Sequence, residues 1–289
     1  MNKIIMQLVA KLRKYFFYFR KGGIKGLVKF YQLNKFEENI FGKKKLKWDN
    51  LGYWKVDPMP TEEELQKFYS QIYWVSNQYY KNNLLIPRDL DHLLFLEKKI
   101  SDKITKNSNF MNFGAGHGGV SYLMASKKIN VINIEPSEIF SKNIKNFYNF
   151  EKIDSFIDVA QDYPKVDIFY SSHTVEHLAD PISFFKKISN ILSDDAKIFI
   201  EVPNCRKSNI TKDYAEGGCD GKITGSHLIY FTKDFFENFN SEISFFKEEL
   251  CEKNYNYTEV NNEDEADCIR AIISAENIKK FFLIKEIKI

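Results

Sequence analysis

Apolar runs of strand length alternate with helical stretches from about residue 109 onward, and this alternation constrains the fold more than any other feature. Strands that alternate with helices predict a mostly parallel sheet with helices on both faces. The predicted strands are 110–113, 131–134, 166–170 and 196–202, and the predicted helices are 120–126, 137–149 and 181–192. After a helix at 233–239, we expect late strands at 245–251 and 268–275, with a polar loop at 254–267 between them.

The N-terminal region differs from this body in charge. Residues 1–50 carry 13 Lys/Arg and 3 Asp/Glu, whereas the rest of the chain carries 29 and 36. We therefore predict a basic, helical extension at 1–85 and a separate domain at 86–289. Residues 3–21 have the apolar spacing of an amphipathic helix, which either packs on the body or lies on an anionic surface such as a membrane.

Two local signals predict further helices before the alternating region. Thr61 and Glu64 have the spacing of a capping box, and Pro60 precedes them, so a helix should begin there. A second helix is expected at 88–100. The four cysteines form no Cys-x-x-Cys pair, and no apolar run reaches the roughly 18–20 residues of a membrane span, so we expect a cytoplasmic protein without a disulfide scaffold.

A glycine-rich loop follows the first of the strands. Gly114, Gly116 and Gly118 stand between a strand and a helix, where glycine allows a sharp turn and the close approach of a ligand. Glu135 ends the next strand, 19 residues after Gly116, and a carboxylate there can accept hydrogen bonds from ribose hydroxyls. Because Gly119 completes the dinucleotide pattern G-x-G-x-x-G, an NAD-dependent oxidoreductase is one alternative, and a tight turn without a ligand is another.

Three later motifs distinguish between these alternatives. They are Asp167–Pro181, which contains Glu-His-Leu-Ala-Asp-Pro, then Ala196–Asn204, which ends in Pro-Asn, then His227–Thr232. In this order the chain resembles class I S-adenosylmethionine-dependent methyltransferases over about residues 88–250, in particular a broad bacterial small-molecule branch. The resemblance implies a Rossmann-like, seven-stranded, mostly parallel sheet with a C-terminal antiparallel hairpin, S-adenosylmethionine as cofactor, and a small-molecule or glycan acceptor.

The resemblance also implies which positions hold the cofactor. The glycine loop would line its methionine and ribose, Glu135 its ribose hydroxyls and Pro136 its adenine, and residues after the fourth strand would face the transferring methyl group. Asn112 stands where the family usually has an acidic residue, which leaves a non-catalytic binding module as an alternative. The implied positions are Asn112, Gly114, Ala115, Gly116, Gly118, Glu135, Pro136, Ser171, Ser172 and His173.

Histidines are the candidate catalytic groups, because methyl transfer to a hydroxyl is helped by a general base that titrates near neutral pH. His227, which follows a glycine-rich polar loop, is the first candidate, and His173 is the second. His177 is expected to tie a short helix to the sheet. We expect His117 to be an exposed turn residue or to touch the cofactor, and His92 to lie on a helix surface.

We expect no metal, although two metal-binding alternatives exist. His173-Thr-Val-Glu-His177 matches the zinc-peptidase signature H-x-x-E-H, but the following Pro181 leaves little room for the helix that this signature needs. A glutamate–histidine site for a divalent cation in the same segment, as in some quinone-ring methyltransferases of this class, is the other. An RNA methyltransferase is also conceivable from the basic extension, but the acidic balance of the body argues against nucleic acid.

The prediction of the acceptor class rests on the branch that the motifs resemble and not on individual residues. The branch that the motifs resemble is common in pathways for bacterial surface polysaccharides. We therefore predict O-methylation of a sugar, a sugar nucleotide or a phosphorylated small molecule in capsule or lipopolysaccharide synthesis. Residues 3–21 could hold such an enzyme at the periphery of the inner membrane. The sequence does not specify the oligomeric state.

Overall fold

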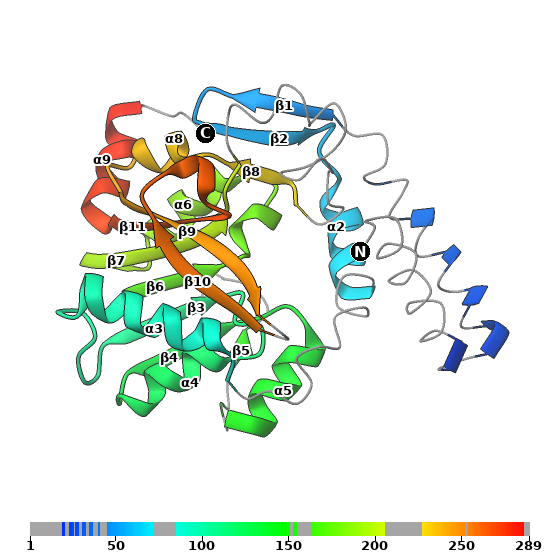
Figure 1. Ribbon diagram of the computed structural model, residues 1–289, viewed down its shortest axis with the longest axis horizontal. Coiled ribbons are helices and arrows are strands. Elements are labelled where there is room, and N and C mark those ends of the chain that lie inside the picture. Colours follow the sequence, from blue (N-terminus) through cyan, green and yellow to red (C-terminus); the bar gives the residue numbers. More distant parts are fainter. Residues whose placement is uncertain are drawn as a thin grey trace.

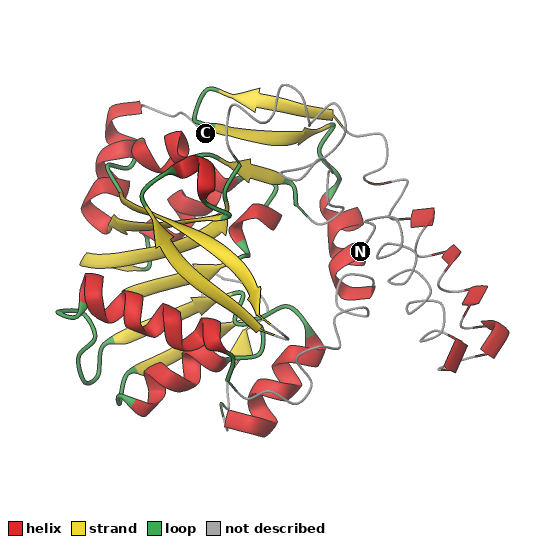
Figure 2. Cartoon of the chain, in the orientation of Figure 1, coloured by secondary structure: helices red, strands yellow, loops and turns green. Residues whose placement is uncertain are grey.

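A central sheet of eight strands organises the described part of the computed structural model (Figures 1 and 2). The structure describes residues 45–71, 85–148, 150, 153–154, 163–205, 227–251 and 254–285, together with short pieces between 19 and 40. The strand order is β10-β9-β11-β7-β6-β3-β4-β5. The strands are β3 (Asn109–Phe113), β4 (Asn130–Ile134), β5 (Ile153–Asp154), β6 (Val166–Ser172), β7 (Leu192–Pro203), β9 (Glu242–Cys251), β10 (Asn254–Val260) and β11 (Cys268–Ser274).

Five of these strands form a parallel core, which confirms the predicted Rossmann-like α/β fold. β5, β4, β3, β6 and β7 pair in parallel, so their carboxyl ends lie along one edge of the sheet. β11 pairs antiparallel with both β7 and β9, which places the antiparallel strands at the C-terminal end as predicted. Ligands of open parallel sheets bind at the carboxyl edge, and Gly114, Glu135 and His173 each directly follow one of these strands.

Helices cover both faces of the sheet because its strands are apolar on both sides. In β7, Phe199 packs into the core beneath α3 (Pro87–Ile100) and α4 (Gly119–Ser126). Its neighbours Ile198 and Ile200 pack into the opposite core with α6 (Pro181–Ser189), α8 (Lys233–Glu237) and α9 (Ala275–Lys285). This period-two division of buried residues is typical of a sheet between two helical layers. α5 (Glu138–Tyr148) follows β4.

The segment predicted as a polar loop at 254–267 contains an additional strand. β10 pairs with β9 over its whole length, and it adds an eighth strand to the seven that were predicted. Tyr257 packs against the core beneath α3 although its neighbours are polar. Aromatic and β-branched residues favour strands, and here they outweigh the polar composition on which the loop prediction rested. The prediction also did not include α9.

We predicted a helical N-terminal extension, but this region also contains a β-hairpin. β1 (Lys45–Asp49) and β2 (Tyr53–Asp57) pair antiparallel, and β2 pairs in turn with β8 (Ile229–Phe231) of the body. Tyr53 is buried against the rings of Phe231 and Phe235. Figure 1 shows this three-stranded sheet beside the main one. Apolar residues at alternate positions, Leu46 and Trp48 in β1 and Trp54 and Val56 in β2, explain why this stretch forms strands.

The capping box predicted at Thr61 is confirmed. The Thr61 backbone N–H donates to Glu64 Oε2 at 2.8 Å, and the Glu64 N–H donates to Thr61 Oγ1 at 3.2 Å. The helix that follows is α2 (Glu62–Gln71). The reciprocal bonds satisfy two of the backbone N–H groups that the first turn of a helix leaves unpaired.

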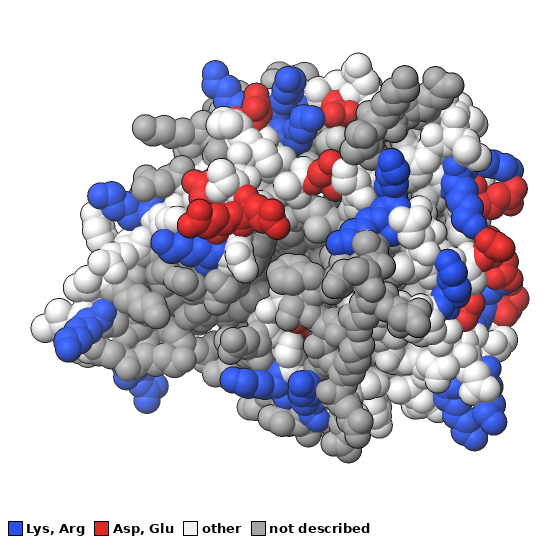
Figure 3. Space-filling model, turned by 180° about the vertical axis from the view of Figure 1, so that it is seen from behind, with Lys and Arg blue, Asp and Glu red and all other residues white. Residues whose placement is uncertain are grey.

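The surface of the described body mixes charges of both signs. Figure 3 shows basic and acidic side chains next to one another along one edge of that face. Ion pairs such as Lys98–Glu259 and Lys279–Asp194 account for part of this mixture. The amphipathic helix predicted at 3–21 lies almost entirely outside the described residues. Among the helices that the structure describes, none combines the length and hydropathy needed to cross a membrane.

Candidate functional site

The glycine-rich loop between β3 and α4 is packed on one side and open on another. Gly114 has φ +75° and Gly116 has φ +56°, both in the region that favours glycine. The backbone N–H groups of Gly114 and Ala115 donate to Ile134 O at 2.9 and 3.0 Å, which fixes the loop on β4. A Cβ atom at Gly114 would lie 2.0 Å from Thr174 Oγ1, whereas one at Gly116 would meet nothing nearer than Gly114 O at 3.9 Å. The loop therefore leaves free space at Gly116.

Glu135 holds the same loop from the end of β4. Its Oε2 accepts from the Gly116 N–H at 2.7 Å, and its Oε1 accepts from the Ser137 N–H at 2.8 Å. Burial raises the pKa of this carboxyl group to about 7, although the two backbone N–H groups act in the opposite direction. Pro136, the next residue, is exposed. A buried carboxylate beside an open glycine is the arrangement that recognition of a ribose needs.

We expect the affinity for an adenosyl ligand to depend on pH through Glu135. A carboxylate accepts hydrogen bonds from ribose hydroxyls, and protonation removes part of this capacity. With a pKa of about 7 in the free protein, the affinity for an adenosyl ligand should rise between pH 6 and pH 8, by at most about tenfold. Calorimetric titration with S-adenosylhomocysteine over this range measures the effect. The Glu135→Gln variant should bind more weakly and without this slope, and parallel profiles for the two proteins would contradict the role of Glu135.

Two other predicted cofactor positions, Asn112 and Ser172, take part in hydrogen-bond networks. The Asn112 amide nitrogen donates to Ser121 Oγ at 2.8 Å, and Ser121 Oγ donates to Asn133 Oδ1 at 2.6 Å. Ser171 is buried, and the Ser172 hydroxyl donates to Glu201 Oε1 at 2.8 Å. The structure thus places the amide of Asn112 beneath α4, and contact of Asn112, Ser171 and Ser172 with a cofactor stays a prediction.

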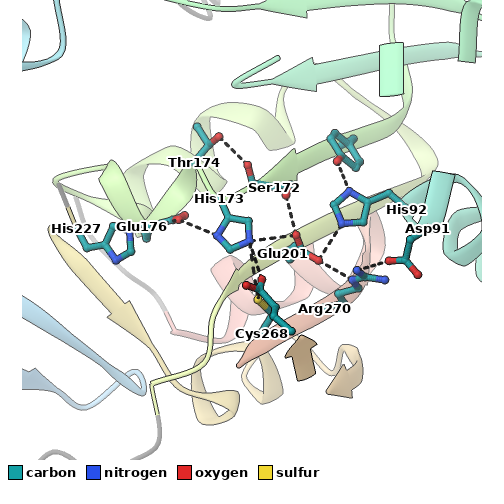
Figure 4. Close-up of polar contacts among 12 residues, drawn as sticks. Asp91, His92, Ser172, His173, Thr174, Glu176, Glu201, His227, Cys268 and Arg270 are labelled. Atoms are coloured by element: carbon teal, nitrogen blue, oxygen red, sulfur yellow. Dashed lines mark hydrogen bonds and ion pairs between the residues drawn. The ribbon is translucent and has the colours of Figure 1, made fainter. Parts of the chain in front are cut away.

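His173 lies between two buried carboxylates at the end of β6 (Figure 4). Its Nδ1 is 3.6 Å from Glu176 Oε1, and its Nε2 is 3.3 Å from Glu201 Oε1. Burial disfavours the imidazolium, but the neighbouring side chains of Cys268, Glu176 and Glu201 raise the pKa of His173 well above its usual value. The φ of His173 is +49°, an uncommon value outside glycine that marks a constrained position. A protonated imidazole cannot accept a further proton, so this geometry does not favour the predicted role as a base.

His227 and His177 lie on the other side of Glu176. The Leu228 N–H donates to the backbone oxygen of Glu176 at 2.9 Å, and this bond brings the segment before β8 to the 3-10 helix η3 (Val175–His177). The Nε2 atoms of His177 and His227 each lie 3.9 Å from Glu176 Oε1. Burial, followed by the charge of His177, lowers the pKa of His227 to about 4. His227 is therefore neutral at pH 7, with a ring nitrogen that can accept a hydrogen bond or bind a cation.

A buried ionic network supports this end of the sheet, and sequence reasoning did not detect it. His92 was predicted on a helix surface, which is wrong: it has no exposed surface and contacts Tyr170 Oη at 2.5 Å and Glu201 Oε2 at 2.9 Å. Glu201 Oε2 also accepts from Arg270 Nε at 2.6 Å, and Arg270 reaches Asp91. The helical spacing of 88–100 gave no signal for a polar residue on its buried face.

His117 in the glycine loop is mostly buried rather than exposed. Its Nε2 lies 2.8 Å from Asp89 Oδ2, and Asp89 also accepts from the Ile86 N–H at the start of α3. His117 therefore ties the loop to α3. The glycines before His227 that were predicted to form a loop over the substrate lie outside the described residues.

Comparison with known families identifies the part of the chain that carries these features. Residues 88–243 match a family model described as a methyltransferase domain. No curated protein sequence matches the chain. The matched residues include the glycine loop, Glu135, η3 and His227, so the family match and the candidate site coincide.

Solved structures share the fold at low sequence identity. A 1,6-didemethyltoxoflavin-N1-methyltransferase from Burkholderia thailandensis, with 1,6-didemethyltoxoflavin and S-adenosylhomocysteine bound, is 9% identical with a TM-score of 0.50. That alignment covers 80% of this chain and 98% of the other. A SAM-dependent methyltransferase from Archaeoglobus fulgidus is 17% identical with a TM-score of 0.46, and 71% of this chain and 100% of that one are covered.

Proposed function

Since this chain belongs to the methyltransferase domain family, we propose that it transfers a methyl group from its cofactor, S-adenosylmethionine, to a hydroxyl oxygen of a small molecule. The methyl group on the sulfonium is already activated. The protein has to align the acceptor oxygen with the S–CH3 bond and to exclude water, which is a matter of proximity and orientation.

One observation carries the proposal. The glycine-rich loop is in direct contact with the segment that carries the histidine cluster, which consists of His173, His177 and His227. Gly114 of the loop approaches Thr174 so closely that a Cβ atom would not fit, and Thr174 lies between His173 and Glu176. The loop and Glu135 would hold the donor. The imidazoles of the cluster are then within reach of an acceptor placed next to the methyl group.

Each residue of the candidate site has a separate role in this proposal. Glu135 binds the ribose hydroxyls, and the open backbone at Gly116 lets the cofactor approach. His227, neutral at pH 7, contacts the acceptor hydroxyl. His173, held between Glu176 and Glu201, contributes positive charge that balances the carboxylates instead of removing a proton. As the C–O bond forms, the C–S bond breaks and its electron pair returns to sulfur. The hydroxyl proton leaves to water.

The acceptor class rests on the sequence resemblance. The motifs Glu176–Pro181, Pro203-Asn204 and His227–Thr232 resemble a broad bacterial branch that is common in pathways for surface polysaccharides and small metabolites. This resemblance supports a sugar, a sugar nucleotide or a phosphorylated small molecule. Capsule or lipopolysaccharide synthesis in the cytoplasm, with residues 3–21 at the periphery of the inner membrane, is the setting that we propose.

Ligand binding and methyl transfer test the proposal in two steps. S-adenosylhomocysteine should raise the melting temperature of the full-length protein, and NADH should not. With methyl-labelled S-adenosylmethionine and a panel of sugars and sugar nucleotides, mass spectrometry should show label on one acceptor. Stabilisation by NADH alone would refute the donor, and label found only on amines would refute transfer to oxygen.

A further inference from the structure

The carboxylate of Glu176 is buried without a hydrogen-bond partner among the described residues. Its side chain is 1% exposed, and neither oxygen has a donor within hydrogen-bond distance. An ionised carboxylate in this state costs free energy unless a positive charge compensates it. His173 Nδ1 lies 3.6 Å from Glu176 Oε1 and supplies part of this positive charge, but at that distance it makes no hydrogen bond to the carboxylate.

The candidate ligand atoms around Glu176 Oε1 are close enough together for one cation to bridge them. The Nε2 atoms of His177 and His227 are 3.9 Å from it, too far for hydrogen bonds, and the three atoms lie within 4.8 Å of one another. Metal–ligand bonds of roughly 2.0–2.2 Å in a tetrahedron separate such ligands by about 3.3 Å. A contraction of about 0.6 Å would bring each imidazole nitrogen to this distance from Glu176 Oε1.

The chemistry of the three ligands narrows the kind of ion. Two imidazole nitrogens and one carboxylate oxygen suit Zn²⁺ and similar transition metals, and three protein ligands leave a position open for water or substrate. The side chains of His177 and His227 are 12% and 22% exposed, whereas Glu176 is at the bottom of the cluster. The open position would therefore lie on the exposed side.

A second cluster of metal-ligating groups is a weaker candidate. His173, Glu248 and Cys268 also lie within ligand distance of one another. There the Cys268 thiol already donates to Glu248 Oε1 at 2.9 Å, so a cation would have to displace a formed hydrogen bond and a proton. Glu176 has no such bond to lose.

We propose that Glu176, His177 and His227 bind one divalent transition-metal ion, Zn²⁺ or an ion of similar ligand preference, whose open position holds the acceptor hydroxyl. The role in the reaction rests on the proposed function. A cation bound to the hydroxyl oxygen lowers its pKa, so that the proton leaves to water and a lone pair of the oxygen forms the bond to the methyl carbon. The C–S bond breaks, and the products are a methyl ether, S-adenosylhomocysteine and one proton. His227 then acts as a ligand, not as the general base predicted from its motif.

Metal titration of the full-length, tag-free protein tests the site without any acceptor. Calorimetry should show one equivalent of Zn²⁺ bound with a Kd below about 1 µM. Bound Co²⁺ should give the visible absorption bands that are typical of this ion at a low coordination number. Glu176→Gln and His227→Gln should each weaken binding about 100-fold or more, because each removes a ligand. Cys268→Ser is the matched control from the second cluster and should bind as the wild type does.

The outcomes separate the metal site from the proposed function. Melting curves with S-adenosylhomocysteine establish that each variant is folded, and His227→Gln, at the partly exposed ligand, remains informative if Glu176→Gln is not. No Zn²⁺ binding, equal binding by wild type and His227→Gln, or loss of binding only in Cys268→Ser would overturn the site. Metal binding without methyl transfer to any hydroxyl would leave the site standing and refute the reaction. Full transfer after chelation would refute the role of the metal alone.

Discussion

Replacing Glu201 by glutamine is expected to lower the free energy of unfolding by about 3–5 kcal/mol, because it breaks a buried ion pair and leaves the other charge behind. Glu201 and Arg270 have no exposed side-chain surface, and Arg270 Nε donates to Glu201 Oε2 at 2.6 Å. Asp91 is then the remaining anionic partner of Arg270 that the structure describes. His92 and Ser172, hydrogen-bonded to the two carboxylate oxygens at 2.9 and 2.8 Å, are then left with the single oxygen of the amide as acceptor.

The matched control is Glu242→Gln in the same sheet. Glu242 pairs with Lys99 at the surface, with 56% of its side chain exposed, so its loss should cost less than about 1 kcal/mol. Urea denaturation of wild type and both variants measures the two values. Equal losses would show that burial of the Glu201–Arg270 pair does not determine its contribution.

The pH dependence of this loss has a definite sign. Burial alone would raise the pKa of Glu201, but His92 and Arg270 lower it well below the usual 4.5. A carboxyl group with a depressed pKa in the folded state stabilises the protein above its unfolded pKa, and this contribution disappears as the pH falls through the folded pKa. The difference between wild type and Glu201→Gln should therefore be constant near neutrality and shrink below about pH 4.5.

Local patterns predicted the sheet and the glycine-rich loop after β3, because these depend on short-range rules. Buried strands appear as apolar runs, the positive φ angles at Gly114 and Gly116 need glycine, and a capping box has a fixed spacing. β10 and the β1–β2 hairpin escaped prediction because polar or charged side chains interrupt their apolar ones. In those strands pairing and a few aromatic contacts decide the structure, and these depend on residues far away in the sequence.

The site was predicted as separate residues, not as an arrangement. His173, His177 and His227 were each named from motifs, but their gathering around Glu176 depends on the bond from Leu228 N–H to Glu176 O and on the pairing of β2 with β8. Neither contact leaves a periodic signal in the sequence. His92 shows the same limit, since a histidine on the buried face of a helix cannot be told from a surface one without knowing that Glu201 lies opposite.

Replacing Gly114 by alanine is expected to weaken S-adenosylhomocysteine binding about 100-fold or more. The new Cβ atom would lie 2.0 Å from Thr174 Oγ1, 2.6 Å from its Cγ2 and 2.8 Å from its Cβ, so either the loop or the segment after β6 has to move. A displacement of about 1 Å in a site of this kind costs roughly two orders of magnitude. The φ of +75° adds about 1–2 kcal/mol of strain for alanine.

The clash and the strain can be separated with Gly116→Ala and with a second substitution at Thr174. Gly116 has a similar φ of +56° but free space around its Cβ position, so Gly116→Ala should cost the strain in stability without the clash. If the cofactor passes over Gly116, that variant should still lose affinity. Thr174→Gly removes all three clashing atoms, so the double variant Gly114→Ala/Thr174→Gly should bind more tightly than Gly114→Ala alone, and the double-mutant cycle gives the coupling energy. A cycle with zero coupling would mean that the contact between Gly114 of the glycine-rich loop and Thr174 does not hold the site together.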